Sequence, residues 1–209
     1  MKVIIGCIIV IIASLISIFI WTSQKRAIPC PFWLRWFVEI ENPFTKNNRS
    51  STIVEQLNIQ AGMTVMDIGC GPGRVTIPLA EAVGSHGKVI AVDIQSKMLE
   101  RAKKKASAKN LQNIEFIRMS IDEANFKPNE ADRIALVNVL GEIPNKQSAL
   151  HEIYQALKPG GILCVTEVIL DPQFQKRETV LKLASKAGFR EKQFFGSKFA
   201  FSLCLEKPV

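Results

Sequence analysis

The segment VMDIGCGPGR, residues 65–74, has a spacing of glycines that suits the binding of a nucleoside. Gly69, Gly71 and Gly73 lack a Cβ, so the backbone can take positive φ values and a ligand can approach it closely. A helix pattern follows the loop, and its first amides would point at the same place. Asp93 closes the apolar run VIAVD, where a carboxylate can accept hydrogen bonds from vicinal ribose hydroxyls. These features predict a nucleoside site at the carboxyl edge of a parallel sheet.

Two residues of this loop argue against a nicotinamide dinucleotide as the ligand. Arg74 stands where the dinucleotide fingerprint G-x-G-x-x-G has its third glycine. Asp67 precedes the glycines, where it would repel a pyrophosphate but could serve as the counter-charge of a cationic amino-acid moiety. The loop therefore favours S-adenosylmethionine.

Three motifs, in this order, resemble those of the class I S-adenosylmethionine-dependent methyltransferases, particularly the branch that methylates lipids, quinones and other small molecules. They are VMDIGCGPGR at 65–74, VIAVDIQSKML at 89–99 and ALKPGGILCVTE at 156–167, and the resemblance covers residues 50–207. It implies a Rossmann-like, doubly wound α/β fold, with a mostly parallel seven-stranded sheet that contains one antiparallel strand. It also implies an enzyme that uses S-adenosylmethionine.

The resemblance places most cofactor contacts on the glycine loop and on the end of the next strand. The expected residues are Asp67, Gly69, Cys70, Gly71, Gly73, Asp93 and Ile94. Asp67 would contact the amino group of the methionine moiety partly through water, with the loop backbone beside it. Asp93 would hold the ribose, and Ile94 would pack on the adenine.

Two residues are candidates for the contact with the adenine amino group. After the third strand the family often carries Gly-Asp-Ala, whose acid accepts a hydrogen bond from that group. Here the sequence is Met119-Ser120-Ile121-Asp122. Either Ser120 takes the place of the acid, or Asp122 supplies the acceptor from beyond Ile121; we favour Asp122.

Two polar residues near the end of the fourth expected strand are candidates for the catalytic site. The side chain of Asn138, or the backbone after it, could face the sulfonium and its methyl group. Glu142 could bind a cationic amine or accept a proton from the nucleophile, although a carboxylate at a helix start is an equally good interpretation. Glu167 and Asp171, after the fifth strand, are weaker candidates on the same rim.

The amino terminus is typical of a membrane-spanning helix. No charged residue occurs from Val3 to Trp21, a run that would span about 28 Å as a helix. A cleaved signal peptide is the alternative, but no small-x-small site follows the run. Lys25 and Arg26 follow it and favour a cytoplasmic catalytic domain.

We therefore expect three parts: a transmembrane anchor (1–24), a juxtamembrane amphipathic segment (25–49) and the methyltransferase domain (50–209). Aromatic and apolar residues recur at helical spacing in the second part, and they are Phe32, Trp33, Trp36, Phe37 and Ile40. This stripe could lie in the membrane interface, cover the mouth of the active site, or pack on the domain's own surface.

Strands and helices alternate after residue 50, which predicts a parallel sheet with helices on both faces. The expected helices are 50–57, 74–83, 96–109, 146–157 and 175–187, and the expected strands are 64–68, 88–93, 114–119, 132–140, 162–168, 190–197 and 199–206. A turn at 158–161 should precede the fifth strand, and the last two strands should pair as a hairpin.

Charge and cysteine content restrict the partners. The net charge of +8 is not gathered into an aromatic-interleaved patch, so an anionic membrane surface explains it more simply than nucleic acid does. The cysteines are Cys7, Cys30, Cys70, Cys164 and Cys204, with no C-x-x-C spacing and only two histidines in the chain. We therefore expect reduced thiols and no metal site.

Together these patterns predict a membrane-anchored methyltransferase with a small, lipophilic acceptor, such as a phospholipid head group, a quinone, or a hydrophobic thiol or amine. Little sequence lies between the fifth strand and the terminal hairpin to form a lid, so the amino-terminal segment and the membrane would help to enclose the acceptor. The alternatives are a tethered protein or RNA methyltransferase, and a non-catalytic module that binds S-adenosylmethionine. The sequence carries no signal for an oligomeric state.

Overall fold

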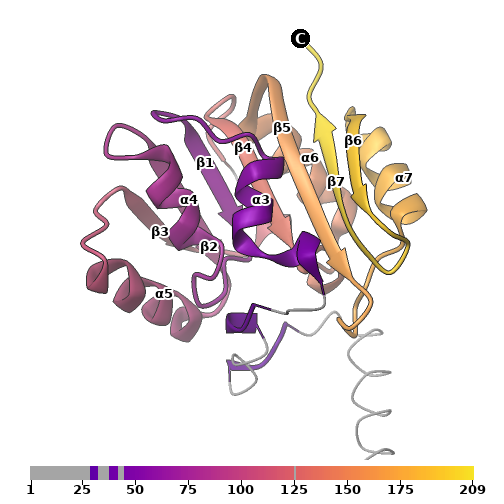
Figure 1. Cartoon of the computed structure of the whole chain (residues 1–209). Coiled ribbons are helices and arrows are strands. Elements are labelled where there is room, and N and C mark those ends of the chain that lie inside the picture. The colour runs from indigo at the N-terminus through magenta and orange to yellow at the C-terminus, as the bar shows by residue number, and fades with distance from the viewer. Residues whose placement is uncertain (1–28, 33–37, 42–44, 125) are drawn as a thin grey trace, which may run out of the picture.

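A seven-stranded sheet in the order β3-β2-β1-β4-β5-β7-β6 forms the centre of the protein (Figure 1). The computed structural model describes residues 29–32, 38–41, 45–124 and 126–209. Strand β7 runs antiparallel to β5 and β6, and the remaining neighbours pair in parallel. The expected doubly wound fold with one antiparallel strand is confirmed.

Every helix and strand predicted after residue 50 is present, with some differences at the ends. The strands are β1 (Thr64–Ile68), β2 (Lys88–Asp93), β3 (Ile114–Arg118), β4 (Ala131–Val137), β5 (Leu157–Val168), β6 (Arg190–Gly196) and β7 (Ala200–Glu206). The α-helices are α3 (Ser50–Gln56), α4 (Thr76–Val83), α5 (Ser96–Ala108), α6 (Lys146–Ala156) and α7 (Arg177–Ala187). Short 3-10 helices are η2 (Lys46–Asn48), η3 (Ile121–Glu123) and η4 (Leu140–Glu142).

The central strands are apolar because the sheet is covered on both faces. Helices α3, α4 and α5 pack on one face, where Val65 and Val89 point, and α6 and α7 pack on the other, where Met66 and Ile90 point. All of these strand side chains are at most 2% exposed. Figure 1 shows α3 and α4 in front of the sheet and α6 behind it. Such burial on both faces is typical of parallel sheets.

Two strand ends differ from the prediction for local reasons. Strand β4 stops at Val137, before the predicted residue 140, because Asn138 has a φ of 54° and turns the chain out of the sheet. Strand β5 begins at Leu157 and includes the expected turn at 158–161. Its pairing with β4 is irregular there, with a register shift between Ala131 and Arg133.

The prediction of reduced cysteines is wrong for one pair. Cys164 in β5 and Cys204 in β7 are joined by a disulfide bond. The two residues stand directly opposite each other in the antiparallel ladder, which brings their side chains together. Cys30 and Cys70 are free thiols, and Cys7 lies outside the described residues.

The expected anchor, residues 1–24, also lies outside the described residues. In the part of the chain that the structure does describe, no helix has the length and apolarity needed to cross a bilayer. Of the aromatic stripe, only Phe32 and Ile40 fall in described positions, and Ile40 is 63% exposed.

Phe201 in β7 should be a major determinant of stability. Its side chain is fully buried, and its ring centroid lies 6.1 Å from that of Phe174 and 5.9 Å from that of Phe194. Phe201→Ala should lower the free energy of unfolding by about 3–5 kcal/mol, because it leaves a cavity in the core. Urea denaturation followed by circular dichroism would measure this loss.

Phe199→Ala is the matched control for this substitution. Phe199 lies two residues earlier in the same hairpin but is 51% exposed. It should change the unfolding free energy by no more than about 0.5 kcal/mol. Equal losses for the two variants would contradict the packing described for the hairpin.

Candidate functional site

A cavity of about 210 Å³ lies at the carboxyl ends of β1, β2 and β4. The strand order reverses between β1 and β4, and open α/β sheets bind their ligands at this switch point. Most of the predicted site residues line the cavity, and these are Gly69, Gly71, Asp93, Ile94, Ser120, Ile121, Asn138 and Glu142. Four others, Asp67, Cys70, Gly73 and Asp122, are not part of its wall.

The glycines of the loop meet different steric demands. All three have positive φ: 69° at Gly69, 51° at Gly71 and 82° at Gly73. A Cβ on Gly69 would collide with Val139, and one on Gly73 would lie 2.9 Å from the Cβ of Ala102 in α5. A Cβ on Gly71 would meet nothing within 4 Å, so this residue presents open backbone to the cavity.

Asp93 joins the end of β2 to the glycine loop. One carboxylate oxygen accepts a hydrogen bond from the amide of Gly71 and the other from the amide of Gln95, each at 2.8 Å. Burial raises the pKa of Asp93, and these amide donors lower it in part. A carboxylate has about four acceptor positions, so Asp93 can still accept hydrogen bonds from a ligand in the cavity.

Asp67 is buried behind the cavity wall, at 2% exposure. Its carboxylate accepts a hydrogen bond of 2.6 Å from the hydroxyl of Thr76 in α4. Burial raises the pKa of Asp67 to about 6, against the opposing effects of Thr76 and the Arg74 guanidinium. A contact from Asp67 to a ligand would therefore have to be indirect, as the prediction of a partly indirect contact allows.

The region expected to meet the adenine has Ser120 on the cavity wall and Asp122 outside it. The Ser120 hydroxyl donates to Asp122 Oδ1 at 2.5 Å, and Asp122 Oδ2 accepts from the Asn145 amide at 3.3 Å. Asp122 thus orients Ser120, and Ser120 is the better placed of the two for a direct contact with a ligand.

Asn138 presents an unused hydrogen-bond acceptor. Its Nδ2 donates to Asn48 Oδ1 at 3.4 Å, while its own Oδ1 is buried without a hydrogen-bond partner among the residues that the structure describes. A buried polar atom without a partner is costly and calls for an explanation, such as an absent ligand. Since Asn138 lines the cavity, a ligand there could satisfy this oxygen.

Glu142 in η4 is the most perturbed acid of the cavity wall. Burial raises its pKa to about 8, and the nearby Asp171 carboxylate adds to the shift. The amide of Cys30 donates to Glu142 Oε1 at 3.1 Å. Burial, together with Glu142, also raises the pKa of the Cys30 thiol to about 11, so this thiol stays protonated near neutral pH.

The weaker candidates lie near Glu142 but are not part of the cavity wall. Glu167 is 1% exposed and accepts a hydrogen bond from the Gln175 amide at 2.9 Å. Burial raises the pKa of Glu167 to about 8 and that of Asp171 above its ordinary value. Among the described residues, no cluster of acids, cysteines and histidines suits a metal ion.

The amino-terminal segment also contributes residues to the cavity wall, and the sequence alone did not identify them as site residues. Pro29, Cys30 and Val38 line it, and the Gln95 side chain donates to the Cys30 carbonyl at 2.9 Å. Glu39 forms ion pairs with Arg101 at 2.8 Å and Lys105 at 3.4 Å on α5. This arrangement favours the interpretation in which the amino-terminal segment covers the site, as far as its described residues 29–32, 38–41 and 45–49 show.

The site fits S-adenosylmethionine by observations of its own geometry. Open backbone at Gly71 allows close approach, and the Asp93 carboxylate suits ribose hydroxyls. The Asn138 oxygen, which has no partner among the described residues, suits a positively polarised group. These features lie on one cavity wall, so a single elongated ligand could contact all of them.

Comparison with known proteins agrees with this geometry. A family model described as a methyltransferase domain matches residues 59–199. The chain is 36% identical over 121 residues to the demethylmenaquinone methyltransferase of Oceanobacillus iheyensis, covering 57% of this chain and 50% of the relative. It is 30% identical over 151 residues to that of Geobacillus stearothermophilus, covering 72% and 59%. The chain thus spans little more than half the length of these curated relatives.

Solved structures share the fold at low sequence identity. A SAM-dependent methyltransferase from Aquifex aeolicus has a TM-score of 0.75 at 20% identity, covering 85% of this chain and 99% of that one. Phosphoethanolamine N-methyltransferase 2 of Haemonchus contortus, in complex with S-adenosyl-L-methionine, has a TM-score of 0.70 at 16% identity, covering 85% and 57%. The family match covers most of the folded domain. The chain therefore belongs to the class I S-adenosylmethionine-dependent methyltransferases.

Proposed function

We propose that this enzyme methylates a small, lipophilic acceptor reached from the membrane, and that a quinone ring is the first candidate. The observation that carries the proposal is the apolar lining of the cavity on segments not assigned to the cofactor, with Val38 from the amino-terminal segment and Ile143 and Pro144 directly after Glu142. The named relatives are demethylmenaquinone methyltransferases, which supports a quinone over other lipophilic acceptors.

The chain's own residues would bind and orient the cofactor. S-adenosylmethionine supplies an electrophilic methyl group on a sulfonium when it is bound. In this proposal Asp93 accepts hydrogen bonds from the ribose, the backbone of Gly69 and Gly71 lies along the methionine moiety, and Asn138 turns its oxygen to the sulfonium end. Most of the catalytic effect would come from orientation and the exclusion of water.

Glu142 is proposed to take up the proton that the acceptor loses on methylation. A base works best when its pKa lies near the working pH, and burial has raised that of Glu142 to about 8. The Cys30 amide holds one carboxylate oxygen, which leaves the other for the proton. The acceptor would gain the methyl group as the bond from the methyl to the sulfonium breaks and leaves its electron pair on sulfur, and the proton that the acceptor loses would pass to Glu142.

We also propose that residues 1–24 form a single-pass anchor and that the catalytic domain faces the cytoplasm. The uncharged run from Val3 to Trp21, followed by Lys25 and Arg26, supports this orientation. In a fractionation test, the full chain should sediment with membranes and resist carbonate extraction. Deleting residues 1–24 should release it. Recovery of the full chain in the soluble fraction would exclude the anchor.

The acceptor class can be tested with methyl-labelled S-adenosylmethionine and the full-length enzyme in lipid nanodiscs. Reduced demethylmenaquinone should become labelled, because its ring suits the apolar cavity, whereas phosphatidylethanolamine supplied in the same nanodiscs should not. Thin-layer chromatography of the organic extract would separate the products. Label in the lipid head group, in protein or in added RNA, with none in the quinone, would overturn the proposal.

Glu142→Gln should change the pH dependence of the reaction. With the native enzyme, kcat/KM should rise with pH, reach half of its maximum near pH 8 and level off above it, because the base acts only when ionised. The variant should be at least about tenfold slower and lack this rise, since general bases contribute roughly 10²–10⁴-fold. Glu100→Gln, on an exposed part of α5, should behave as the native enzyme. An unchanged profile in Glu142→Gln would remove the assignment.

The same substitution should also change how the free energy of unfolding depends on pH. In the native protein this free energy should fall over the pH range in which the activity rises. The pKa of Glu142 is raised in the folded state, so its contribution to stability is fully present below pH 4.5 and is lost as the pH rises through about 8. Relative to the native protein, Glu142→Gln should therefore become progressively more stable between these pH values. Chemical denaturation at several pH values would measure this, and a constant difference would contradict the raised pKa.

A further inference from the structure

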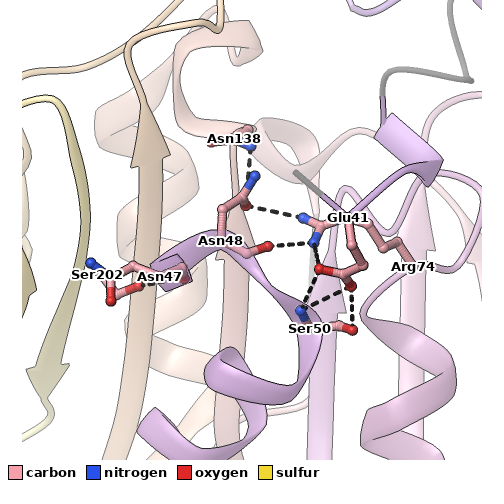
Figure 2. A network of polar contacts seen from close by, with 7 residues as sticks. All are labelled: Glu41, Asn47, Asn48, Ser50, Arg74, Asn138 and Ser202. Atoms are coloured by element: carbon pink, nitrogen blue, oxygen red, sulfur yellow. Dashed lines mark hydrogen bonds and ion pairs between the residues drawn. The ribbon is translucent and has the colours of Figure 1, made fainter. Parts of the chain in front are cut away.

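A buried arginine links the amino-terminal segment to the glycine loop. The side chain of Arg74 is 10% exposed, and Nη1 donates to the backbone carbonyl of Asn48 at 2.5 Å while Nη2 donates to Asn48 Oδ1 at 3.1 Å. Nη1 also lies 3.6 Å from a carboxylate oxygen of Glu41. Figure 2 shows Asn48 between Arg74 on one side and Asn138 on the other.

The hydrogen-bonding capacity of arginine determines how both asparagines are oriented. A guanidinium can only donate, so Asn48 must turn its amide oxygen toward Arg74. The same oxygen accepts the hydrogen bond from Asn138 Nδ2 at 3.4 Å. Because Asn48 presents an acceptor, Asn138 must present its NH₂ group there, and its own oxygen points elsewhere.

The turn that carries Asn48 is itself held in place from two sides. The Ser202 hydroxyl in β7 donates to the carbonyl of Asn47 at 3.4 Å, and it also bonds Thr166 in β5 at 2.9 Å. On the cavity side, the amide of Asn138 donates to the Thr166 carbonyl at 2.8 Å. Ser202 in β7 thus holds the turn through Asn47, and Thr166 in β5 holds the backbone of Asn138, so both segments are tied to neighbouring strands of the sheet.

We propose that Arg74 and Asn48 are positioning residues that orient the Asn138 amide so that its oxygen, not its NH₂ group, meets the sulfonium end of the cofactor. An amide oxygen carries negative partial charge and suits a sulfonium, whereas an NH₂ group would repel it. The Oδ1 of Asn138, which is buried without a partner in the part of the chain that the structure describes, is the atom available for this contact. The inference rests on the proposed place of the cofactor in the cavity.

This role also explains an otherwise unusual residue. Arg74 occupies the position where a dinucleotide-binding loop has its third glycine. Here the preceding residue, Gly73, makes the close approach to Ala102 in α5, so the next position is free to carry a long side chain. That side chain reaches Asn48, which lies 26 residues earlier in the chain.

S-adenosylmethionine and S-adenosylhomocysteine are the probes for this proposal, since they differ only in the methyl group and the sulfonium charge. Binding of each to the full chain would be measured by isothermal titration calorimetry. Asn48→Leu removes the acceptor and leaves the Asn138 amide free to rotate. It should weaken S-adenosylmethionine by a factor of about three to five and leave S-adenosylhomocysteine unchanged, because the oxygen can still turn to the sulfonium but is no longer held there, so the loss is smaller than that of a whole hydrogen bond to a charged group.

Three further variants test whether the effect arises from the contact between Asn48 and Asn138. Asn48→Asp keeps an oxygen acceptor between Arg74 and Asn138, so it should preserve or increase the preference for the charged cofactor. Asn47→Leu, the same change on a neighbour that contacts Ser202 through its backbone carbonyl only, should leave the preference at the native value. Asn138→Leu removes the oxygen itself and should give a larger selective loss than Asn48→Leu, of at least about tenfold. Thermal unfolding would confirm that each variant is folded.

The experiment distinguishes failure of the positioning role from failure of the proposed cofactor site. Equal weakening of both ligands by Asn48→Leu would show a merely structural role and overturn the inference, as would an unchanged preference. Asp93→Ala should weaken both ligands alike, because it acts on the ribose that they share. If it weakened neither, the cofactor would lie elsewhere, and the proposed site would fail independently of Arg74 and Asn48.

Discussion

The hydrogen bond from the amide of Gly71 to the carboxylate of Asp93 is the interaction on which the site depends. It holds a left-handed bend after β1 against the end of the neighbouring strand β2. The same carboxylate accepts from the amide of Gln95, whose side chain in turn contacts the Cys30 carbonyl. The glycine loop, the start of α5 and the segment that closes the cavity are therefore positioned by one buried acid.

Buried acids are a further feature of the carboxyl edge of the sheet. Desolvation raises the pKa of Asp67 to about 6 and that of Glu142 to about 8, because a charged carboxylate is costly in an apolar environment. Each keeps a donor that eases this cost: the Thr76 hydroxyl for Asp67 and the Cys30 amide for Glu142. If Glu142 receives the proton as proposed, its raised pKa suits that role.

The amino-terminal segment connects this chemistry to the proposed anchor. Its described residues contact α5 through Glu39, the glycine loop through Asn48, and η4 through Cys30. If the preceding residues span the membrane as proposed, the part of the chain that leaves the bilayer is also the part that covers the active site. An acceptor could then pass from the lipid to the cavity without crossing bulk water.

Local patterns were enough to predict the fold and most of the residues that line the candidate cavity. Apolar runs define strands, and glycines at positive φ together with Asp93 define the loop, because backbone sterics and hydrogen-bonding capacity act over a few residues. The contacts that sequence reasoning missed are distant ones. The Cys164–Cys204 bond depends on strand register, and the Cys30 amide meets Glu142 across 112 residues. The sequence by itself thus determined which residues could bind the methyl donor. Only the tertiary structure decided which buried groups meet, and so which acids hold their protons, because desolvation and hydrogen bonding depend on neighbours that are remote along the chain.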